Sequence, residues 1–416
     1  MIFRSLRLYR QISPKYCFLR MSCVTPAEYT RVIKVEDVIQ FCMRCLEKVG
    51  VNKDHCGALA EVLVAGDHRG HYSHGINRLE MYVMDVEKGV CSKEGEPVIE
   101  KETVSTALVN GRNLLGPVVG NFCMKLAIEK AKKTGVAWIT AYGSNHFGIA
   151  GWYSLMASNA GLLGMAFTNT SPLVYPTRSK QRAMGTNPLT VAAPSSKAGD
   201  EFVLDMATSA VALGKIEMCR RRGIPIPHGW GADKNGKSTT DPAEAAGEGA
   251  LFPLGGEEQN SGYKGFGLGM MVEIFCGIMA GGAYGTNVRR WMATDRPANL
   301  GQAFVAIDPN AFASGFGDRM SDYVNSMRNL SRVDEKQPVV IPGDPEREHI
   351  EECRKMGGIR YPPVLIDSMG WLGGMVVSSS VFAGLNPGGS AFRRIVKRLP
   401  DELLTSKTCF SPLCVC

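Results

Sequence analysis

The chain has 416 residues, of which 44% are hydrophobic and 21% charged. This composition is that of a globular protein with room for two or three domains, and it excludes an intrinsically disordered chain. The 47 glycines follow no three-residue period, which excludes a collagen-like protein, and no run of about 18 strongly apolar residues points to a protein that crosses a membrane repeatedly.

The net charge of +7 is concentrated at the two ends of the chain. Residues 1–27 carry five basic and no acidic side chains, and residues 363–416 carry five basic and three acidic ones, so the region between them is neutral. A neutral body lacks the basic face that binds nucleic acid, and we expect no such partner. The basic N-terminus has the composition of a mitochondrial transit peptide, but also that of a structureless extension ahead of a start at Met21.

In chain order, the pattern of apolar residues predicts helices and then alternating strands and helices. The predicted elements are helices at 33–50, 52–69 (capped by Asn52 or Asp54) and 71–89, a strand at 105–111, a helix at 116–135, strands at 136–142, 162–170 and 202–209, a helix at 209–222, a helix from 262, a strand at 302–308 and a helix at 314–329. This order predicts an α/β fold with a mixed sheet and flanking helices.

Two motifs suggest chemistry that their surroundings do not support. Cys42 and Cys45 form a C-x-x-C pair, but they lie on the apolar face of a predicted helix with no second pair or histidine cluster, so we expect buried free thiols. Residues 231–238 match the phosphate-binding pattern G-x-x-x-x-G-K-S, yet no apolar strand precedes them and no helix follows. We interpret this match as coincidental, and we expect no metal site.

The first of two histidine-centred turns spans residues 67–78. It brings Ser73, His74 and Arg78 into one turn and the start of a helix. A guanidinium group can bind a carboxylate at two points, and an imidazole can exchange a proton near neutral pH. These are the groups that a 2-oxo acid requires, although three exposed polar residues at a helix start are the simpler interpretation.

The second turn, residues 143–151, follows the predicted strand 136–142. It contains His146, and we expect backbone N–H groups beside Gly148 and Gly151 to bind a phosphate group. The spacing is not the G-x-G-x-x-G pattern of a Rossmann fold, which occurs after no predicted strand. Any dinucleotide site is therefore expected to be of a non-Rossmann type.

Together these segments resemble the malate/L-lactate dehydrogenase family, which also contains sulfolactate, ureidoglycolate and piperideine-2-carboxylate oxidoreductases. The matching segments are SHGINRL (73–79), SNHFGIAGWY (144–153), GTNP (185–188), LDMATSAVALGKIE (204–217), GYKGFGLGMMVEI (262–274), ANLGQAF (298–304) and GGIR (357–360). The resemblance implies a family-specific dinucleotide-binding fold, a homodimer, and hydride transfer between NAD or NADP and a small 2-hydroxy acid, with malate the first candidate.

The resemblance also implies roles for individual residues. Ser73 and His74, with His146 as the alternative acid or base, fall on catalytic positions, and Arg78, Thr186 and Lys215 fall on substrate-binding positions. The implied cofactor contacts are His146, Phe147, Gly148, Ile149, Ala150, Asp205, Met206, Ala207, Tyr263, Lys264, Asn299, Leu300, Gly301 and Gln302. Lys215 stands where imine-reducing members carry an aspartate, and a cation there suits a dicarboxylate substrate.

We expect NAD rather than NADP, because the recognisable cofactor segments contain no arginine cluster, although Arg178 and Arg182 lie in a loop that could bind a 2′-phosphate. We expect a cytoplasmic enzyme, with a mitochondrial one as the alternative.

The resemblance gives the following division of the chain: a basic extension (1–30), an N-terminal helical part of the substrate and dimer domain (31–110), an NAD(P)-binding and catalytic α/β region (111–330), a return segment (331–362) and a divergent tail (363–416). The tail departs from the family pattern, and we expect it to be poorly ordered. An alternative to an active enzyme is therefore a catalytically silent form that binds nucleotide or pairs with another chain.

Overall fold

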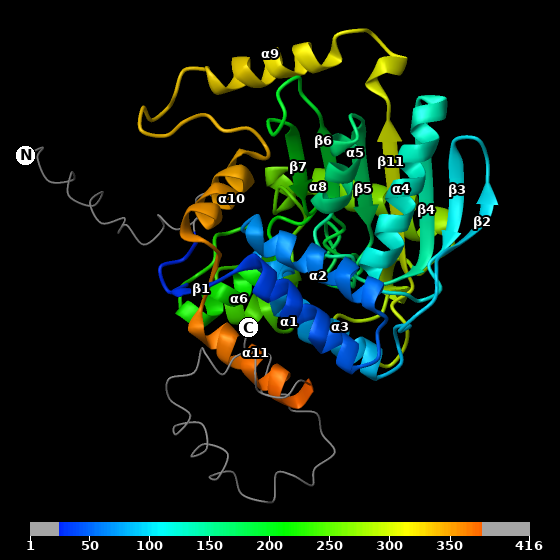
Figure 1. Ribbon diagram of the computed structural model, residues 1–416. Coiled ribbons are helices and arrows are strands. Elements are labelled where there is room, and N and C mark those ends of the chain that lie inside the picture. The colour runs from blue at the N-terminus through cyan, green and yellow to red at the C-terminus, as the bar shows by residue number, and fades with distance from the viewer. Residues whose placement is uncertain (1–24, 377–416) are drawn as a thin grey trace, which may run out of the picture.

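The computed structural model describes residues 25–376, and its centre is a seven-stranded sheet (Figure 1). Strands β3 and β4 are parallel, and all other neighbours in this sheet are antiparallel. In spatial order the strands are β2 (Val98–Glu102), β3 (Thr106–Asn110), β4 (Val136–Ser144), β11 (Leu300–Ile307), β5 (Leu163–Thr168), β6 (Leu189–Ala193) and β7 (Phe202–Met206). The predicted mixed α/β architecture is confirmed.

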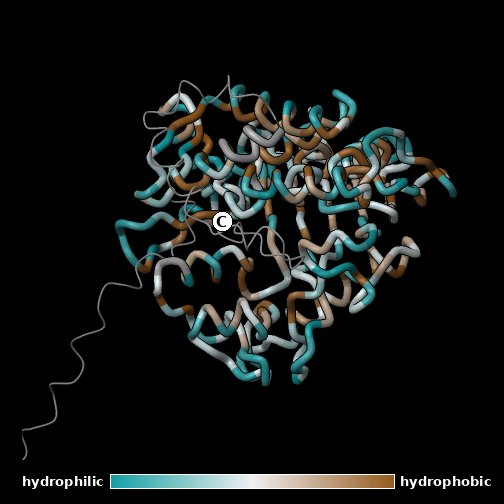
Figure 2. Tube along the Cα trace, turned by 90° about the horizontal axis from the view of Figure 1, so that it is seen from below, coloured by the Kyte–Doolittle hydropathy of each residue, from teal (hydrophilic) through white to brown (hydrophobic). Residues whose placement is uncertain are grey.

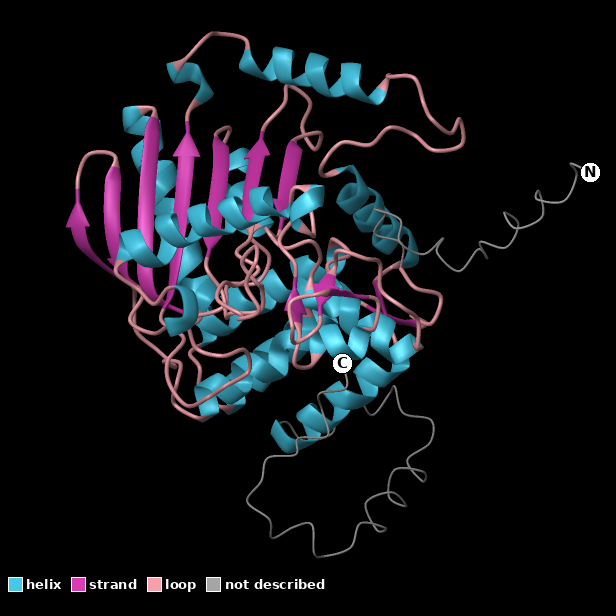
Figure 3. Ribbon diagram, turned by 180° about the vertical axis from the view of Figure 1, so that it is seen from behind, coloured by secondary structure: helices cyan, strands magenta, loops and turns pink. Residues whose placement is uncertain are grey.

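Helices cover both faces of this sheet (Figure 3). Along β4, Ile139 points to the face covered by α4 (Gly116–Thr134) and α5 (Gly151–Asn159), whereas Trp138 points to the opposite face. That opposite face is covered by α8 (Gly262–Glu273) and the π-helical turn Ile274–Ile278. Successive side chains of a strand point to opposite faces, so both helical layers bury apolar residues of the same strands.

A second helical layer packs against one edge of the sheet. It consists of α1 (Val35–Lys48), α2 (Lys53–His68) and α3 (Leu79–Glu87), and α2 lies against α4. Buried residues of α1 recur at helical spacing, and Cys42 and Cys45 are among them as free thiols. The expectation that this pair is structural is confirmed, and Asn52 is the residue that caps α2, with its side chain accepting from the N–H of His55.

The two ends of the described chain meet in this layer. Strand β1 (Arg31–Ile33) pairs antiparallel with β12 (Ile359–Tyr361), which follows α10 (Asp344–Met356). The segment after residue 362 was expected to be poorly ordered, but its first part forms α11 (Pro363–Val376). The buried side chains Leu365, Ile366 and Met369 join the apolar core around α1, which is why this part of the expected tail is helical. Residues 1–24 and 377–416, with the transit-peptide question and most of the tail, lie outside the described residues.

The remaining elements surround the sheet. They are α6 (Leu213–Arg222), β8 (Gly231–Ala232), β9 (Ser238–Thr239), α7 (Pro242–Ala246), β10 (Ala250–Leu251) and α9 (Phe316–Arg328). The phosphate-loop pattern at 231–238 forms the turn between the antiparallel strands β8 and β9, with no helix directly after it, so the coincidental interpretation is confirmed.

Hydrophobic residues gather in the interior segments, and hydrophilic residues occupy many outer turns (Figure 2). Among the helices that the structure describes, none has the length and apolar content needed to cross a membrane.

Helix α11 provides a test of the packing at the end of the chain. Leu365 is 6% exposed and its neighbour Val364 is 55% exposed, so the two positions form a matched pair on one helix. Leu365→Ala removes buried apolar volume, and we expect it to lower the free energy of unfolding in urea by about 2 to 5 kcal/mol. Val364→Ala should change this free energy by less than about 0.5 kcal/mol. Equal effects of the two changes would mean that α11 does not pack as described.

Candidate active site

The topology brings the predicted site segments to one edge of the sheet. Because β4, β5 and β7 run in the same direction, their carboxyl ends lie at the same edge, and the antiparallel strands β6 and β11 begin there. His146 follows β4, Thr186 precedes β6, Asp205 lies near the end of β7, and Asn299 precedes β11. Helix α2 and the first histidine turn pack beside the same edge (Figure 1). Segments far apart in sequence therefore meet in one region.

The first histidine turn is held by a buried carboxyl group. The predicted helix 71–89 is wrong at its start, because residues 72–74 and 76–78 form two separate 3₁₀ turns ahead of α3. Between them, the N–H of Ile76 donates to Oδ2 of Asp67 at 2.9 Å, and the hydroxyl of Tyr361 donates to the same oxygen at 2.9 Å. A Cβ at Gly75 would lie 1.6 Å from Oδ1 of Asp67, so only glycine fits there. Gly75, with φ of −95° and ψ of −145°, separates the two turns, so the α-helix begins only at Leu79.

Burial changes the protonation of Asp67. The residue is 1% exposed, and the loss of water raises its pKa from 3.8 to about 7, against the lowering effect of its two hydrogen bonds. The protonated form is therefore populated in the neutral range, and no cation is needed to balance the group.

Two imidazole rings stack at the centre of the region. The rings of His74 and His146 lie 5.8 Å apart with an angle of 17° between their planes. Nδ1 of His74 lies 2.8 Å from Oγ of Ser73, and Nδ1 of His146 lies 2.5 Å from the hydroxyl of Tyr82. The two histidines that the sequence singled out separately are thus brought together.

The hydrogen bonds around His146 define where its proton lies. The N–H of Gly148 donates to Nδ1 at 3.3 Å, so Nδ1 carries the lone pair and the hydroxyl of Tyr82 donates to it as well. The neutral ring then carries its hydrogen on Nε2. Burial and the nearby charge of Arg78 lower the pKa of His146 to about 3, and burial, His146 and Arg78 lower that of His74. Both rings are therefore neutral near pH 7.

Arg78 lies beside this pair. Its Nε donates to the carbonyl oxygen of Ser73 at 2.7 Å, and its guanidinium carbon lies 5.3 Å from the centre of the Trp291 ring. Trp291 also approaches His146, with 5.7 Å between the ring centres. A cation over an aromatic face is attracted to that face, so Trp291 helps to hold the guanidinium of Arg78 in place.

The second histidine turn differs from the phosphate-binding turn that we expected. The N–H of Gly148 donates to His146, and that of Gly151 donates to Oδ2 of Asp205 at 2.7 Å, so both already have acceptors. A Cβ at Gly148 would lie 2.3 Å from the side chain of Val62, and one at Gly151 would lie 2.6 Å from the carboxylate of Asp205. These glycines allow close packing within the protein, which is a different reason from the approach of a phosphate.

The other predicted contacts differ in their accessibility. Phe147, Gly148, Ile149 and Ala150 are buried, which leaves His146 as the half-buried member of its turn. Leu300, Gly301 and Gln302 are buried in β11, where Nε2 of Gln302 donates to the carbonyl of Asn145. The accessible members are the half-buried Asp205, Met206 and Ala207, the half-buried Asn299, and the exposed Tyr263 and Lys264 on the first turn of α8.

Of the two remaining predicted substrate residues, Lys215 lies near the first histidine turn and Thr186 lies at the sheet edge. Lys215 is exposed on the first turn of α6, and a Cβ at the preceding Gly214 would lie 3.1 Å from Cβ of Ser73, so this helix start adjoins the turn. The hydroxyl of Thr186 lies 3.4 Å from that of Thr170, which follows β5 at the same sheet edge. The backbone carbonyl of Thr186 accepts from the N–H of Thr208.

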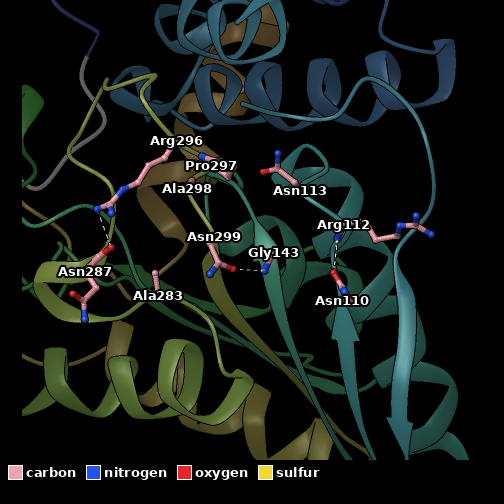
Figure 4. Close-up of a pocket in the computed structure, with 10 residues that line it drawn as sticks. All are labelled: Asn110, Arg112, Asn113, Gly143, Ala283, Asn287, Arg296, Pro297, Ala298 and Asn299. Carbon is pink, nitrogen blue, oxygen red and sulfur yellow. Dashed lines mark hydrogen bonds between the residues drawn. The ribbon is translucent and has the colours of Figure 1, made fainter. Parts of the chain in front are cut away.

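A cavity of about 530 Å³ opens beside the ends of β3 and β4. Figure 4 shows Asn299 next to Gly143, whose N–H donates to the Asn299 side chain at 2.9 Å. The cavity is lined by Asn110, Arg112, Asn113, Gly143, Ala283, Asn287, Arg296, Pro297, Ala298 and Asn299. Neither histidine of the stacked pair lines it, so of the predicted contacts it includes Asn299 alone.

Several residues at the site were not identified as site residues from the sequence. Tyr82 follows Arg78 by one helical turn, so its spacing was an available signal. No local sequence pattern marked Asp67 or Trp291 as a site residue. Asp67 approaches the turn through the space left by Gly75, and Trp291 lies far along the chain from His146, which it contacts.

Comparisons with known proteins agree on one family. A family profile described as malate/L-lactate dehydrogenase matches residues 33–370. A malate dehydrogenase of Pyrococcus abyssi is 38% identical over 340 residues, which is 81% of this chain and 92% of the relative. An L-sulfolactate dehydrogenase of Methanocaldococcus jannaschii is 37% identical over 78% of this chain and 90% of its own length. The structure of malate dehydrogenase from Pyrococcus horikoshii superposes with a TM-score of 0.78 at 34% identity, covering 85% of this chain and 97% of that one.

The raised pKa of Asp67 predicts a pH dependence of stability. A carboxyl group whose pKa is higher in the folded chain contributes stability that is complete below its unfolded pKa of 3.8 and is lost as the pH rises through about 7. Asp67→Asn keeps the shape and cannot ionise. We therefore expect the free energy of unfolding of the wild-type protein, relative to this variant, to fall over that range and then level off.

Urea unfolding across this pH range measures the difference, and Asp318→Asn on the exposed face of α9 is the matched control. A difference between wild type and Asp67→Asn that stays constant or grows with pH contradicts the burial of an uncompensated carboxyl group.

Proposed function

The chain belongs to the malate/L-lactate dehydrogenase family, and from this premise we propose that it transfers a hydride between NAD and a small 2-hydroxy acid, with malate and oxaloacetate as the first pair. The observation that carries the proposal is the stacked, neutral pair His74 and His146 beside the guanidinium of Arg78. This arrangement combines a carboxylate-binding group with two groups that handle the oxygen on C2.

Arg78 is proposed to bind the C1 carboxylate. A guanidinium group offers two parallel N–H donors to a carboxylate, and such charge-assisted bonds are stronger than neutral ones. Its position on the turn with His74 fixes the distance between the bound carboxylate and the imidazoles. The exposed cation Lys215 near the same turn is proposed to favour a second carboxylate on the substrate.

The two imidazoles are proposed to divide the work at the C2 oxygen. Two donors on Nδ1 of His146 leave it an N–H on Nε2, so it donates a hydrogen bond to that oxygen. His74, oriented by Ser73, then accepts the hydroxyl proton when the hydroxy acid is oxidised and returns it in the reduction. When bound, the nicotinamide ring accepts the hydride from C2 or supplies it. A substrate carboxylate at Arg78 reduces the local positive charge and so favours protonation of His74 in the reduction.

The accessible residues support the proposal that a dinucleotide binds along the sheet edge. Proposed cofactor contacts are His146, Asp205 to Ala207, Tyr263, Lys264 and Asn299, all of which have exposed or half-buried side chains. Asn299, which precedes β11, lines the cavity of about 530 Å³. This cavity has space for a polar group of the cofactor. The other predicted contacts are buried and are proposed to shape the site from behind.

The surroundings of two loop arginines support NAD over NADP. Arg178 pairs with Glu258 through two nitrogens, and Arg182 donates to the backbone carbonyls of Gly247 and Gly249. A 2′-phosphate would have to displace these partners.

Exposed apolar side chains on successive turns, among them Met270, Ile274 and Ile278, support the proposal that the protein is a homodimer.

A panel of 2-oxo acids assayed with NADH and with NADPH tests the function. We expect wild-type protein to oxidise NADH with oxaloacetate, and Arg78→Lys to raise KM for oxaloacetate by about 10- to 100-fold, because an ammonium group loses the two-point bond. Arg354→Lys, on the exposed side of α10, is the matched control and should behave as wild type.

Three results count against different parts of the proposal. No turnover of any 2-oxo acid with either nucleotide contradicts the dehydrogenase activity itself. Unchanged KM and kcat in Arg78→Lys, with an active wild type, remove Arg78 from the substrate site. A lower dissociation constant for NADPH than for NADH reverses the cofactor preference.

A further inference from the structure

Trp291 contacts both sides of the candidate substrate site. It lies in a turn, residues 290–293, within the segment that connects the 3₁₀ turn Gly285–Asn287 to β11. Its half-buried indole packs against the core of the N-terminal helices, 5.7 Å from the ring of His146 and 5.3 Å from the guanidinium carbon of Arg78. A ligand that bridges Arg78 and His146 therefore lies against the indole.

A buried ion pair holds this turn in place. Arg289 and Asp85 have side chains that are 7% and 3% exposed, with 2.8 Å between Nη2 and Oδ2. Nη1 of Arg289 also donates to the carbonyl of Arg296, which ties the two ends of the segment together. A charge pair buried in this way is costly to separate, so the position of Trp291 is set by the fold.

The same ion pair fixes Trp291 relative to the histidine. Oδ2 of Asp85 accepts from the side-chain amide of Asn145 at 2.9 Å, and Oδ1 of Asn145 accepts from the N–H of His146 at 2.8 Å. One carboxylate thus connects α3, the histidine turn and the turn of Trp291. Beside the indole, Met292 has φ of +62°, a conformation that few residues other than glycine adopt and that tends to occur at functional sites.

We propose that Trp291 is a specificity-determining residue whose indole forms the wall against which the C2 substituent of the substrate lies. This inference rests on the proposed function, because it takes Arg78 as the carboxylate site and the imidazoles as the oxygen site. With these two groups of a 2-oxo acid fixed, its third substituent must pass the indole. The wall leaves space for a short chain and excludes a bulky ring such as that of phenylpyruvate.

The size of the C2 substituent provides the test. We compare kcat/KM for phenylpyruvate with that for oxaloacetate, using NADH, in wild type, Trp291→Ala and Trp291→Phe. We expect Trp291→Ala to shift this ratio toward phenylpyruvate by about tenfold or more, and Trp291→Phe to shift it less, since pocket volume is worth about 10- to 200-fold in discrimination. Trp138→Phe is the matched control, because Trp138 packs against Phe167 and Phe275 on the α8 face of the sheet.

A ratio that stays the same while both values fall together would mean that Trp291 only supports the fold, and it overturns the proposal. Binding of L-malate, followed through tryptophan fluorescence, gives a second readout that needs no turnover. We expect saturable quenching in wild type and Trp138→Phe, and its loss in Trp291→Phe. An equal signal change in all three proteins, or none in wild type, overturns the placement of Trp291 at the ligand, whereas an inactive wild type with the expected quenching contradicts the proposed reaction alone.

Discussion

The buried carboxyl group of Asp67 is the contact on which the arrangement of the candidate site depends. It binds the N–H of Ile76 and the hydroxyl of Tyr361, so it joins the end of α2, the turn that carries His74 and Arg78, and the last strand of the fold. The absence of a side chain at Gly75 is what allows this approach. Because a buried carboxyl group without its partners costs free energy, the fold keeps the turn against Asp67 rather than letting it continue as a helix.

The second constraint is the direction of the strands. β4, β5 and β7 end where β6 and β11 begin, and this edge receives the turn held by Asp67. His146 then stacks on His74, and the Asp85–Arg289 ion pair adds Trp291 from a third segment. The chemistry proposed here therefore depends on the meeting of three distant segments, each positioned by a buried polar contact rather than by apolar packing alone.

Features that depend on neighbouring residues could be predicted from the sequence. Helices with a periodic apolar face, such as α1 and α4, were placed to within a few residues, and the group Ser73, His74 and Arg78 was recognisable from spacing.

Strand β2 was missed because its side chains are almost all exposed, and α10 was missed because its face buries only His349 and Cys353. Contacts across the chain, such as Tyr361 on Asp67 or Trp291 on Arg78, leave no mark on neighbouring residues and needed the structure. The glycines at 148 and 151 were noticed as places for a ligand to approach, and the structure shows a close protein neighbour at each, because a close neighbour and a close ligand both require glycine.

The proposed chemistry requires the fold to hold His74 and His146 as a stacked, neutral pair with the hydrogen of His146 on Nε2. Nitrogen-15 NMR of the imidazoles measures this directly, and the single variants His74→Ala and His146→Ala assign the two signals among the seven histidines. At about pH 7, where a free imidazole is partly charged, we expect neutral rings at both positions and an Nε2–H form at His146. An imidazolium signal at either position, or a hydrogen on Nδ1 of His146, would contradict this expectation.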